Sequence, residues 1–112
     1  MNVMGDCSFG MTGMDIETAS RNNIGILTVV FNNQVMACER AVMEVSTEKF
    51  EALSVGGNYS KVAEGLNVTS RRVDKPSDIA GAVKEALDVT SSNKPFLLEI
   101  VAKEGYEFSR YP

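Results

Sequence analysis

The pattern of apolar positions changes its period along the chain, and this predicts strands and helices in alternation. Residues 26–31 form an apolar run that is rich in β-branched side chains and hardly alternates with polar ones. Such a run is typical of a strand covered on both faces, as in a parallel sheet. After Pro76, apolar residues instead recur at helical spacing, which predicts the buried stripe of a helix. These stripe residues are Ile79, Val83, Ala86 and Leu87.

The same reasoning places the remaining elements. We expect strands at 2–4, 26–31, 69–73 and 96–102, and helices at 14–21, 59–66 and from 76 to about 92. Residues 5–13 carry three glycines and are predicted as a loop, and a short helix is predicted near 47–53 within an irregular region. Residues 103–112 are expected to form a polar, aromatic tail. This order predicts an α/β fold: part of a doubly wound parallel sheet with helices on both faces.

Composition limits the classes of partner. A chain of 112 residues is at most one domain, and its 44% hydrophobic and 23% charged content is ordinary for a globular fold. The net charge is −4 and the longest basic cluster is Arg71-Arg72, so we expect no nucleic-acid partner. No apolar run is long enough for a membrane span, and residues 1–4 are too short and uncharged for a signal peptide. Cys7 and Cys38 are therefore expected to be free thiols of a cytoplasmic protein.

The chain contains no histidine, and this removes several kinds of site. Ser-His hydrolases, Cys-His proteases and His-ligated zinc centres all require that residue. Any general acid or base supplied by the chain must then be Asp, Glu, Lys, Tyr or Cys.

Two polar turns follow neighbouring predicted strands. Gly5-Asp6-Cys7 comes after the first strand and Asn32-Asn33 after the second, with 25 residues between Asp6 and Asn32. That separation is the length of one strand–helix–strand crossover, and ligands bind beyond the carboxyl ends of parallel strands. Carboxylate and amide oxygens suit Mg²⁺, and a loop entering a helix N-terminus favours a phosphate. Alternatively, each dipeptide is ordinary turn chemistry.

This pattern resembles the diphosphate-anchoring motif of thiamine-diphosphate-dependent enzymes, GDG followed at this distance by NN. Residues 5–14, 56–66 and 95–102 look like the acetolactate synthase and 2-oxo-acid decarboxylase branch of that family. The resemblance implies that residues 1–112 are the C-terminal portion of a thiamine-diphosphate-binding domain, with upstream strands and the other enzyme domains absent. It also implies thiamine diphosphate and Mg²⁺ as cofactors.

Site residues follow from the resemblance, position by position. The metal ligands would be the Asp6 carboxylate, the Asn33 amide oxygen and the backbone carbonyl of Val35. The cofactor-binding set would be Gly5, Asp6, Cys7, Ser8, Phe9 and Asn33, with no catalytic residue in the chain. Cys7 departs from the usual glycine, and it fits only where the backbone does not need a positive φ. Phe9 and Met11 either line the cofactor pocket or simply pack in the core.

The resemblance implies a lyase or transferase as the parent enzyme, which decarboxylates a 2-oxo acid with or without carboligation. In that family a second domain supplies the glutamate that activates the cofactor, so the isolated chain is expected to be inactive. We expect it to associate with the missing domains and with itself, at least as a dimer. Two alternatives stay open: a stand-alone, non-catalytic diphosphate-binding module, and a truncated remnant. The substrate is not specified by these residues.

Overall fold

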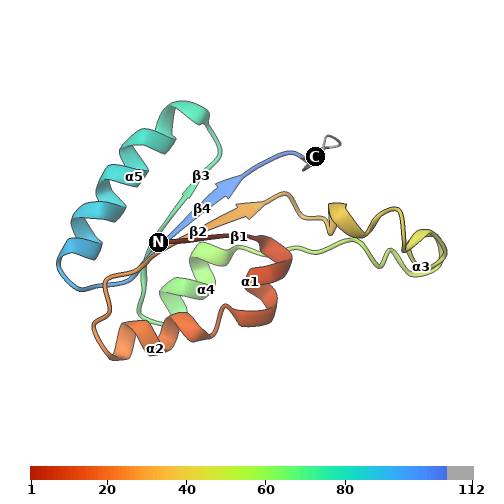
Figure 1. Cartoon of the computed structure of the whole chain (residues 1–112). Helices are drawn as coiled ribbons and strands as arrows, with labels where there is room; N and C mark the ends of the chain where they lie inside the picture. Colours follow the sequence, from red (N-terminus) through yellow and green to blue (C-terminus); the bar gives the residue numbers. More distant parts are fainter. Residues whose placement is uncertain (106–112) are drawn as a thin grey trace, which may run out of the picture.

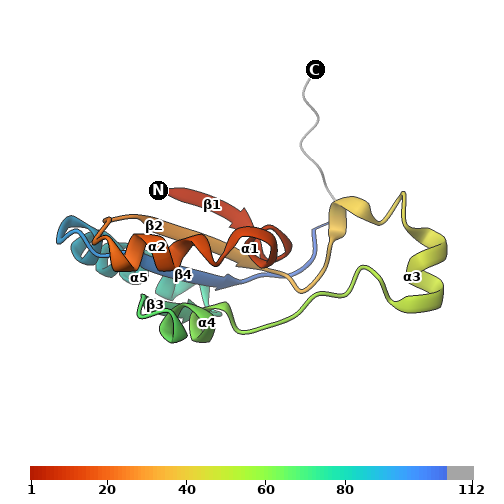
Figure 2. The same cartoon turned by 90° about the horizontal axis from the view of Figure 1, so that it is seen from below.

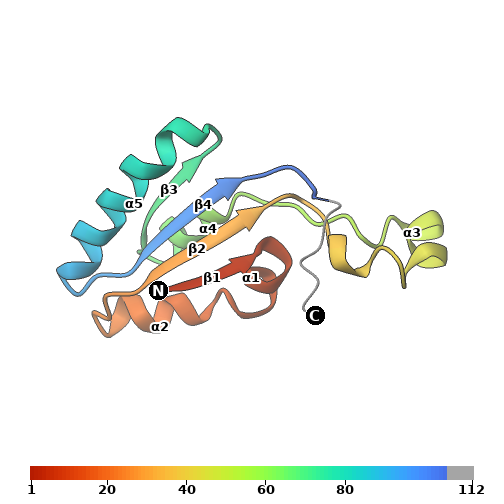
Figure 3. The same cartoon turned by 45° about the horizontal axis from the view of Figure 1, so that its top comes forward.

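The computed structural model describes residues 1–105 and contains a four-stranded parallel sheet; positions 106–112 of the expected tail lie outside the described residues. The strands are β1 (Asn2–Gly5), β2 (Leu27–Asn32), β3 (Thr69–Val73) and β4 (Phe96–Val101), in the spatial order β1-β2-β4-β3 (Figures 1 and 3). Every neighbouring pair is parallel. The predicted α/β architecture with a parallel sheet is confirmed.

Helices lie on both faces of this sheet, as expected. Figure 2 shows α1, α2 and α4 along one face and α5 on the other, with α3 away from the sheet. The helices are α1 (Asp6–Thr12), α2 (Asp15–Arg21), the 3-10 turn η1 (Ala37–Glu39), α3 (Glu44–Phe50), α4 (Tyr59–Gly65) and α5 (Pro76–Ser91).

The two central strands carry the core. Their side chains point alternately to the two faces, so each face receives its own apolar layer. One layer lies between the sheet and the helices α1, α2 and α4. It consists of Phe9, Ile16, Val30, Tyr59, Ala63, Val68 and Leu97. The other packs against α5 and consists of Leu27, Val29, Val73, Ala82, Ala86, Phe96 and Leu98. Coverage on both faces is why these strands are apolar along most of their length.

Residues 5–13 are the main error of the sequence prediction, because α1 replaces most of the expected loop. The glycines argued for a loop, since a glycine inside a helix costs about 0.5–1 kcal/mol relative to alanine. Tertiary packing outweighs that cost: Phe9 is 4% exposed and its ring meets Tyr59 edge-to-face at 5.5 Å between centroids. The buried aromatic side chain therefore holds the short helix against the sheet.

Two smaller expectations also need correction. The short helix near 47–53 is α3, which begins at Glu44 and ends before Glu51, a residue with a left-handed φ of 51°. Leu87 does not belong to the buried stripe of α5, since it is 55% exposed. The helix buries Ala86, as predicted, and also Ala82, which the predicted stripe did not include; these small side chains let α5 lie close to the sheet.

Residues 36–53, called the arm below, project away from the sheet (Figures 1 and 2). The base of the arm is closed by the isolated bridge between Val35 and Ser54, with a 2.9 Å hydrogen bond from the Met36 amide to the Leu53 carbonyl. Its apolar side chains at Val42 and Phe50 are 76% and 78% exposed. Within residues 1–105, no helix is both long enough and apolar enough to span a bilayer.

Candidate functional site

A cavity of about 590 Å³ lies at the carboxyl edge of the sheet, beside the arm. Its walls come from the end of β1, the start of α1, the loop after β2 and the first part of the arm. They are formed by Gly5, Asp6, Cys7, Ser8, Met11, Asn33, Val35, Met36, Ala37, Cys38, Glu39 and Met43. The fold thus brings together six of the seven residues that the sequence singled out, and Phe9 is the exception.

Asp6 is the residue that joins the two loops of this cavity. Its side chain is buried, with the residue 2% exposed, directly after β1. Oδ1 accepts a hydrogen bond of 2.8 Å from the Cys7 amide. Oδ2 accepts one of 2.7 Å from the amide of Gln34, which lies in the loop after β2. A carboxylate has about four lone-pair sites, so both oxygens keep capacity for a further partner.

The loop after β2 is shaped by local hydrogen bonds. Asn33 Oδ1 accepts the amide of Val35 at 3.2 Å, which is an Asx turn. Gln34, between them, has a left-handed φ of 61°, a conformation that is uncommon for a residue with a β-carbon. The bridge to Ser54 is formed by the Gln34 carbonyl and the Met36 amide, so it does not involve the Val35 carbonyl.

The donor set of the cavity fits a small hard cation. It offers a carboxylate, a side-chain amide oxygen and a main-chain carbonyl, all of which are oxygen ligands of the kind Mg²⁺ takes. Only one of these ligands is charged, and residues 1–105 contain no group of three or more His, Cys, Asp or Glu side chains suited to a metal. A Mg²⁺ ion held here would therefore complete its octahedral shell with water or with the oxygens of a phosphate-bearing ligand.

Gly5 and Cys7 agree with a ligand beside the start of α1. Gly5 has an ordinary extended backbone with φ −80°, and a β-carbon added to it would meet no atom within 4 Å. The fold itself therefore does not demand glycine at this position, whereas a close ligand would. Cys7 lies inside α1 and is not among the residues with positive φ, so the condition for replacing the family's glycine is met.

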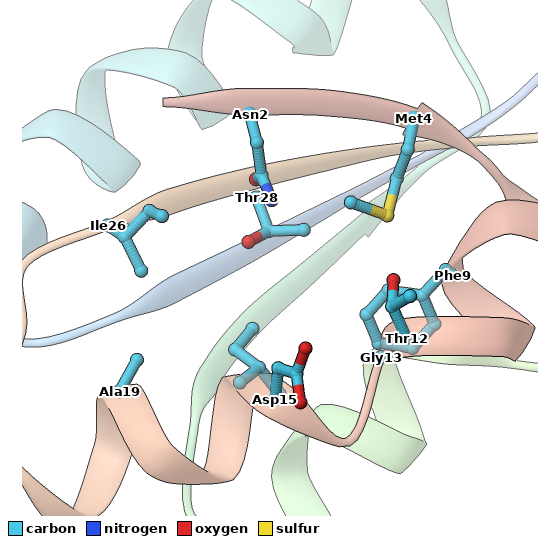
Figure 4. Close-up of a pocket in the computed structure, with 10 residues that line it drawn as sticks. Asn2, Met4, Phe9, Thr12, Gly13, Asp15, Ala19, Ile26 and Thr28 are labelled. Atoms are coloured by element: carbon cyan, nitrogen blue, oxygen red, sulfur yellow. The ribbon is translucent and has the colours of Figure 1, made fainter.

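Phe9 lies elsewhere. Figure 4 shows it beside a second, smaller cavity of about 140 Å³ between the sheet and the α1–α2 segment, with Asn2, Met4 and Thr28 on the sheet side. Its side chain is a core residue, one of the two roles that the sequence left open for it. Any contact of Phe9 with a ligand would have to come from its backbone amide, and this stays a prediction.

A buried polar network beside the site was missed by sequence reasoning. Glu99 on β4 is 0% exposed and Asn32 at the end of β2 is 1% exposed. Asn32 Nδ2 donates to Glu99 Oε1 at 2.6 Å, and the Ser60 amide donates to Glu99 Oε2 at 2.9 Å. Arg72 Nη1 donates to Glu99 Oε1 at 2.9 Å. One charged residue inside the apolar run 96–101 was the signal that could have revealed it.

Tyr59 is near enough to Glu99 of this network, and to Asp6 and Cys7 of the cavity, for their charges to act on its hydroxyl. Burial raises the pKa of its hydroxyl above the ordinary value of 10.0, and the negative charges of Asp6, Glu99 and Cys7 raise it further. The same hydroxyl is thus influenced by both the proposed metal ligand Asp6 and the buried Glu99.

Comparison with known proteins gives a family. The model for "Thiamine pyrophosphate enzyme, C-terminal TPP binding domain" matches residues 1–100. The mitochondrial acetolactate synthase of Schizosaccharomyces pombe is 27% identical over 106 residues, covering 93% of this chain and 15% of the relative. A probable acetolactate synthase large subunit of Methanococcus aeolicus is 25% identical over 113 residues, covering 98% of this chain and 18% of that protein.

The fold is also found in solved structures. The thiamine diphosphate-dependent 4-hydroxybenzoylformate decarboxylase of Rhodococcus jostii RHA1 superposes with a TM-score of 0.77 at 20% identity, over 94% of this chain and 20% of that one. Benzoylformate decarboxylase from Polynucleobacter necessarius gives a TM-score of 0.77 at 21% identity, over 90% and 19% of the two chains. In each comparison the chain spans a fifth or less of the relative's length.

Proposed function

The chain belongs to the thiamine pyrophosphate enzymes, as a C-terminal TPP-binding domain, and we propose that it holds the diphosphate end of that cofactor through Mg²⁺. Thiamine pyrophosphate is thiamine diphosphate under another name. In the proposal, Asp6, Asn33 and the Val35 carbonyl bind the metal. The Ser8 hydroxyl and the amides at positions 7–9 bind the diphosphate. When bound, the cofactor supplies the electron sink for cleavage next to a carbonyl.

One observation carries this proposal: the hydrogen bond of 2.7 Å from the Gln34 amide to Asp6 Oδ2. It fastens the loop after β2 to the carboxylate after β1. Asp6, Asn33 and Val35 border a single cavity. Ligands from two adjacent parallel strands at their carboxyl ends are what a site in an open α/β sheet requires.

The test is calorimetric titration of the chain with thiamine diphosphate in the presence of Mg²⁺. Asp6→Asn keeps an acceptor oxygen but removes the charge, and Asn33→Ala removes the amide ligand. We expect either change to weaken binding by at least about tenfold, equivalent to about 1.4 kcal/mol. Asp88→Ala is the matched control, because this exposed aspartate on α5 lies far from the cavity. Unchanged affinity in both site variants would refute the assignment.

We also propose that the parent reaction is decarboxylation of a 2-oxo acid, with or without carboligation. Support comes from the acetolactate synthases among the relatives, of which this chain spans 15% and 18%. The rest of the pocket would come from polypeptide outside these 112 residues. Because such groups orient the reacting atoms and account for many orders of magnitude in rate, the chain alone should release no carbon dioxide from pyruvate, benzoylformate or oxalyl-CoA. Carbon dioxide release by the wild-type chain, if it disappeared in Asp6→Asn, would overturn this prediction.

A stand-alone, non-catalytic diphosphate-binding module is the alternative, and it is favoured by the position of the ligands. All of the proposed ligands lie at the diphosphate end of the cofactor, so the thiamine portion is not needed for them. Competition with inorganic pyrophosphate separates the two functions. Equal affinity for pyrophosphate and thiamine diphosphate, with Mg²⁺ present, would favour the module. A clear preference for thiamine diphosphate would favour the enzyme domain.

The proposed partners are the remaining domains of the enzyme and a second copy of the chain. Val3 on β1 and Phe31 on β2 are 55% and 44% exposed on the sheet face that α5 covers elsewhere. The arm adds further exposed apolar side chains. Exposed apolar surface of this kind favours association, so at least a dimer is proposed.

A cytoplasmic location is proposed as well. It is supported by two cysteines that are both free in the structure, as thiols are in a reducing compartment. Cell fractionation with an antibody against the chain would test it.

A further inference from the structure

Glu99 is a charged side chain placed at the centre of the sheet. It lies on β4, which pairs with β2 on one side and β3 on the other, and no part of it is exposed. Three donors converge on its two carboxylate oxygens: Asn32 Nδ2 at 2.6 Å, the Ser60 amide at 2.9 Å and Arg72 Nη1 at 2.9 Å. Each partner comes from a different element, so the carboxylate joins β2, α4 and β3 to β4.

One of these connections, through Asn32, reaches the loop that borders the proposed cofactor cavity. Asn32 directly precedes Asn33, and its Nδ2 also donates to the Gly57 carbonyl at 3.1 Å. The side-chain amide is therefore oriented by two acceptors and cannot be turned round without losing both. Because the next residues carry the Asx turn and the bond to Asp6, the direction in which β2 leaves the sheet depends on Asn32.

The network is poorly suited to stability alone. Taking a carboxylate and its partners out of water carries a desolvation cost that often exceeds the attraction between them. In addition, Asn32 Oδ1 and Ser60 Oγ are buried without a hydrogen-bond partner within the described residues. Unpaired buried oxygens oppose folding. An arrangement that keeps these costs is better explained by the geometry it imposes on its neighbours.

We infer that Glu99 is a positioning residue, which acts through Asn32 to hold the loop 33–35 in the geometry needed for Mg²⁺ and diphosphate. This inference rests on the proposed function for its ligand, but the geometry it describes exists in the free chain. Charge is essential to the role. A glutamine at position 99 would present an NH₂ group to a site where three donors already converge, and at least one bond would be lost.

The first test needs no cofactor and measures amide hydrogen exchange by NMR in the 112-residue chain. In Glu99→Gln, we expect the amides of Gln34 and Ser60 to exchange about tenfold faster, because the anchor of both segments is weakened. Arg71→Gln is the matched control. Arg71 is next to Arg72 on β3, and the substitution removes its 2.7 Å ion pair with Glu85 on α5, whose two side chains are 41% and 44% exposed. Exchange at Gln34 should not change in this control.

A second variant keeps the test decisive if Glu99→Gln does not fold. Asn32→Ala cuts the connection between Glu99 and the loop, and it leaves the bonds to Ser60 and Arg72 in place. Exchange at Gln34 should then accelerate while exchange at Ser60 stays as in the wild type. Slow exchange at Gln34 in every folded variant of this pair would overturn the inference.

The second readout is affinity for Mg²⁺ and thiamine diphosphate, measured at a temperature where circular dichroism shows each variant folded. Residues that orient metal ligands typically change affinity by about 10-fold to 100-fold, and we expect Glu99→Gln to fall in this range. A purely structural role would lower the melting temperature but not this affinity. Wild-type chain that binds no cofactor would refute the proposed function, whereas the exchange result would still decide the role of Glu99.

Discussion

The sheet and the arm are both rich in apolar residues, but the central strand β4 buries them, whereas the arm, apart from Leu53 at its base, leaves several of its large apolar side chains exposed. Phe96, Leu97 and Leu98 on β4 are all 0% exposed. In the arm, Val42, Val45 and Phe50 are 76%, 65% and 78% exposed. Similar side chains thus have opposite environments.

This difference separates what local sequence determines from what needs a partner. A strand in the middle of a parallel sheet receives a helix on each face, so its apolar run is satisfied by the same polypeptide. The arm forms the short helix α3, which buries none of its residues against the rest of residues 1–105; only Leu53, at the base of the arm, is buried. The sheet with its helices, called the frame below, is therefore stabilised by packing within the chain. The exposed apolar side chains of the arm would be buried only by a binding partner.

The largest effect should come from truncating one side chain in each region. Leu98→Ala leaves a cavity in the layer beneath α5, and such changes cost about 2–5 kcal/mol of unfolding free energy. Val45→Ala should change it by no more than about 0.5 kcal/mol, since that side chain is largely in water. Urea denaturation measures both. Equal losses would mean that the arm is packed as the sheet is, and the contrast would be wrong.

The next effect concerns association rather than folding. If the arm contributes to the proposed dimer, the double substitution Val45→Asp and Phe50→Asp should weaken self-association by at least about tenfold, because charges would be buried in an apolar contact. Unfolding of the monomer should be almost unchanged. Analytical ultracentrifugation gives the dissociation constant, and Lys49→Asp on the same helix is the control for added charge. A wild-type chain that is monomeric at micromolar concentration would count against the proposed dimer.

A smaller effect is expected at the cavity, where the sheet edge and the arm meet. Gly5→Ala should cost less than about 1 kcal/mol of stability, since it changes only an N-cap without a side-chain bond. Affinity for thiamine diphosphate should nevertheless fall about tenfold if the ligand lies against this backbone. Gly10→Ala, in the same helix but off the cavity, should stabilise the fold by about 0.5–1 kcal/mol and leave affinity alone. The same affinity in both variants would contradict the proposed position of the diphosphate.

The sequence predicted the frame well because its signals were local. The unbroken run at 26–31 and the helix after Pro76 both follow from period and composition, and they are confirmed within a residue or two as β2 and α5. Asp6 and Asn33 could be placed on one edge because parallel strands bring their carboxyl ends together. No long-range information was needed for either step.

Other features depend on contacts that no short window contains. The helix α1 forms in a glycine-rich segment because Phe9 meets Tyr59, 50 residues later in the chain. In the sequence, Glu99 is a single charge within an apolar strand. Its hydrogen-bond partners Asn32, Ser60 and Arg72 become evident only in the folded structure. These contacts join residues that are 27 to 67 positions apart, so local pattern could not reveal them.

The smallest effect is a pH dependence that belongs to the frame and not to the arm. Tyr59 has a raised pKa in the folded chain, chiefly through burial and then through Asp6, Glu99 and Cys7. The neutral phenol is therefore favoured by folding, and its contribution is complete below the ordinary value of 10.0. It is lost as pH rises through the higher folded pKa, because between the two pKa values the phenol is ionised in the unfolded chain but still protonated in the folded one.

The free energy of unfolding of the wild type should thus fall more steeply above pH 10.0 than that of Tyr59→Phe, in which the ring packing is kept but the ionisable group is gone. Denaturation curves collected below and above this pH give the comparison. Parallel curves for the two proteins would show that the Tyr59 hydroxyl ionises as freely in the folded chain as in the unfolded one.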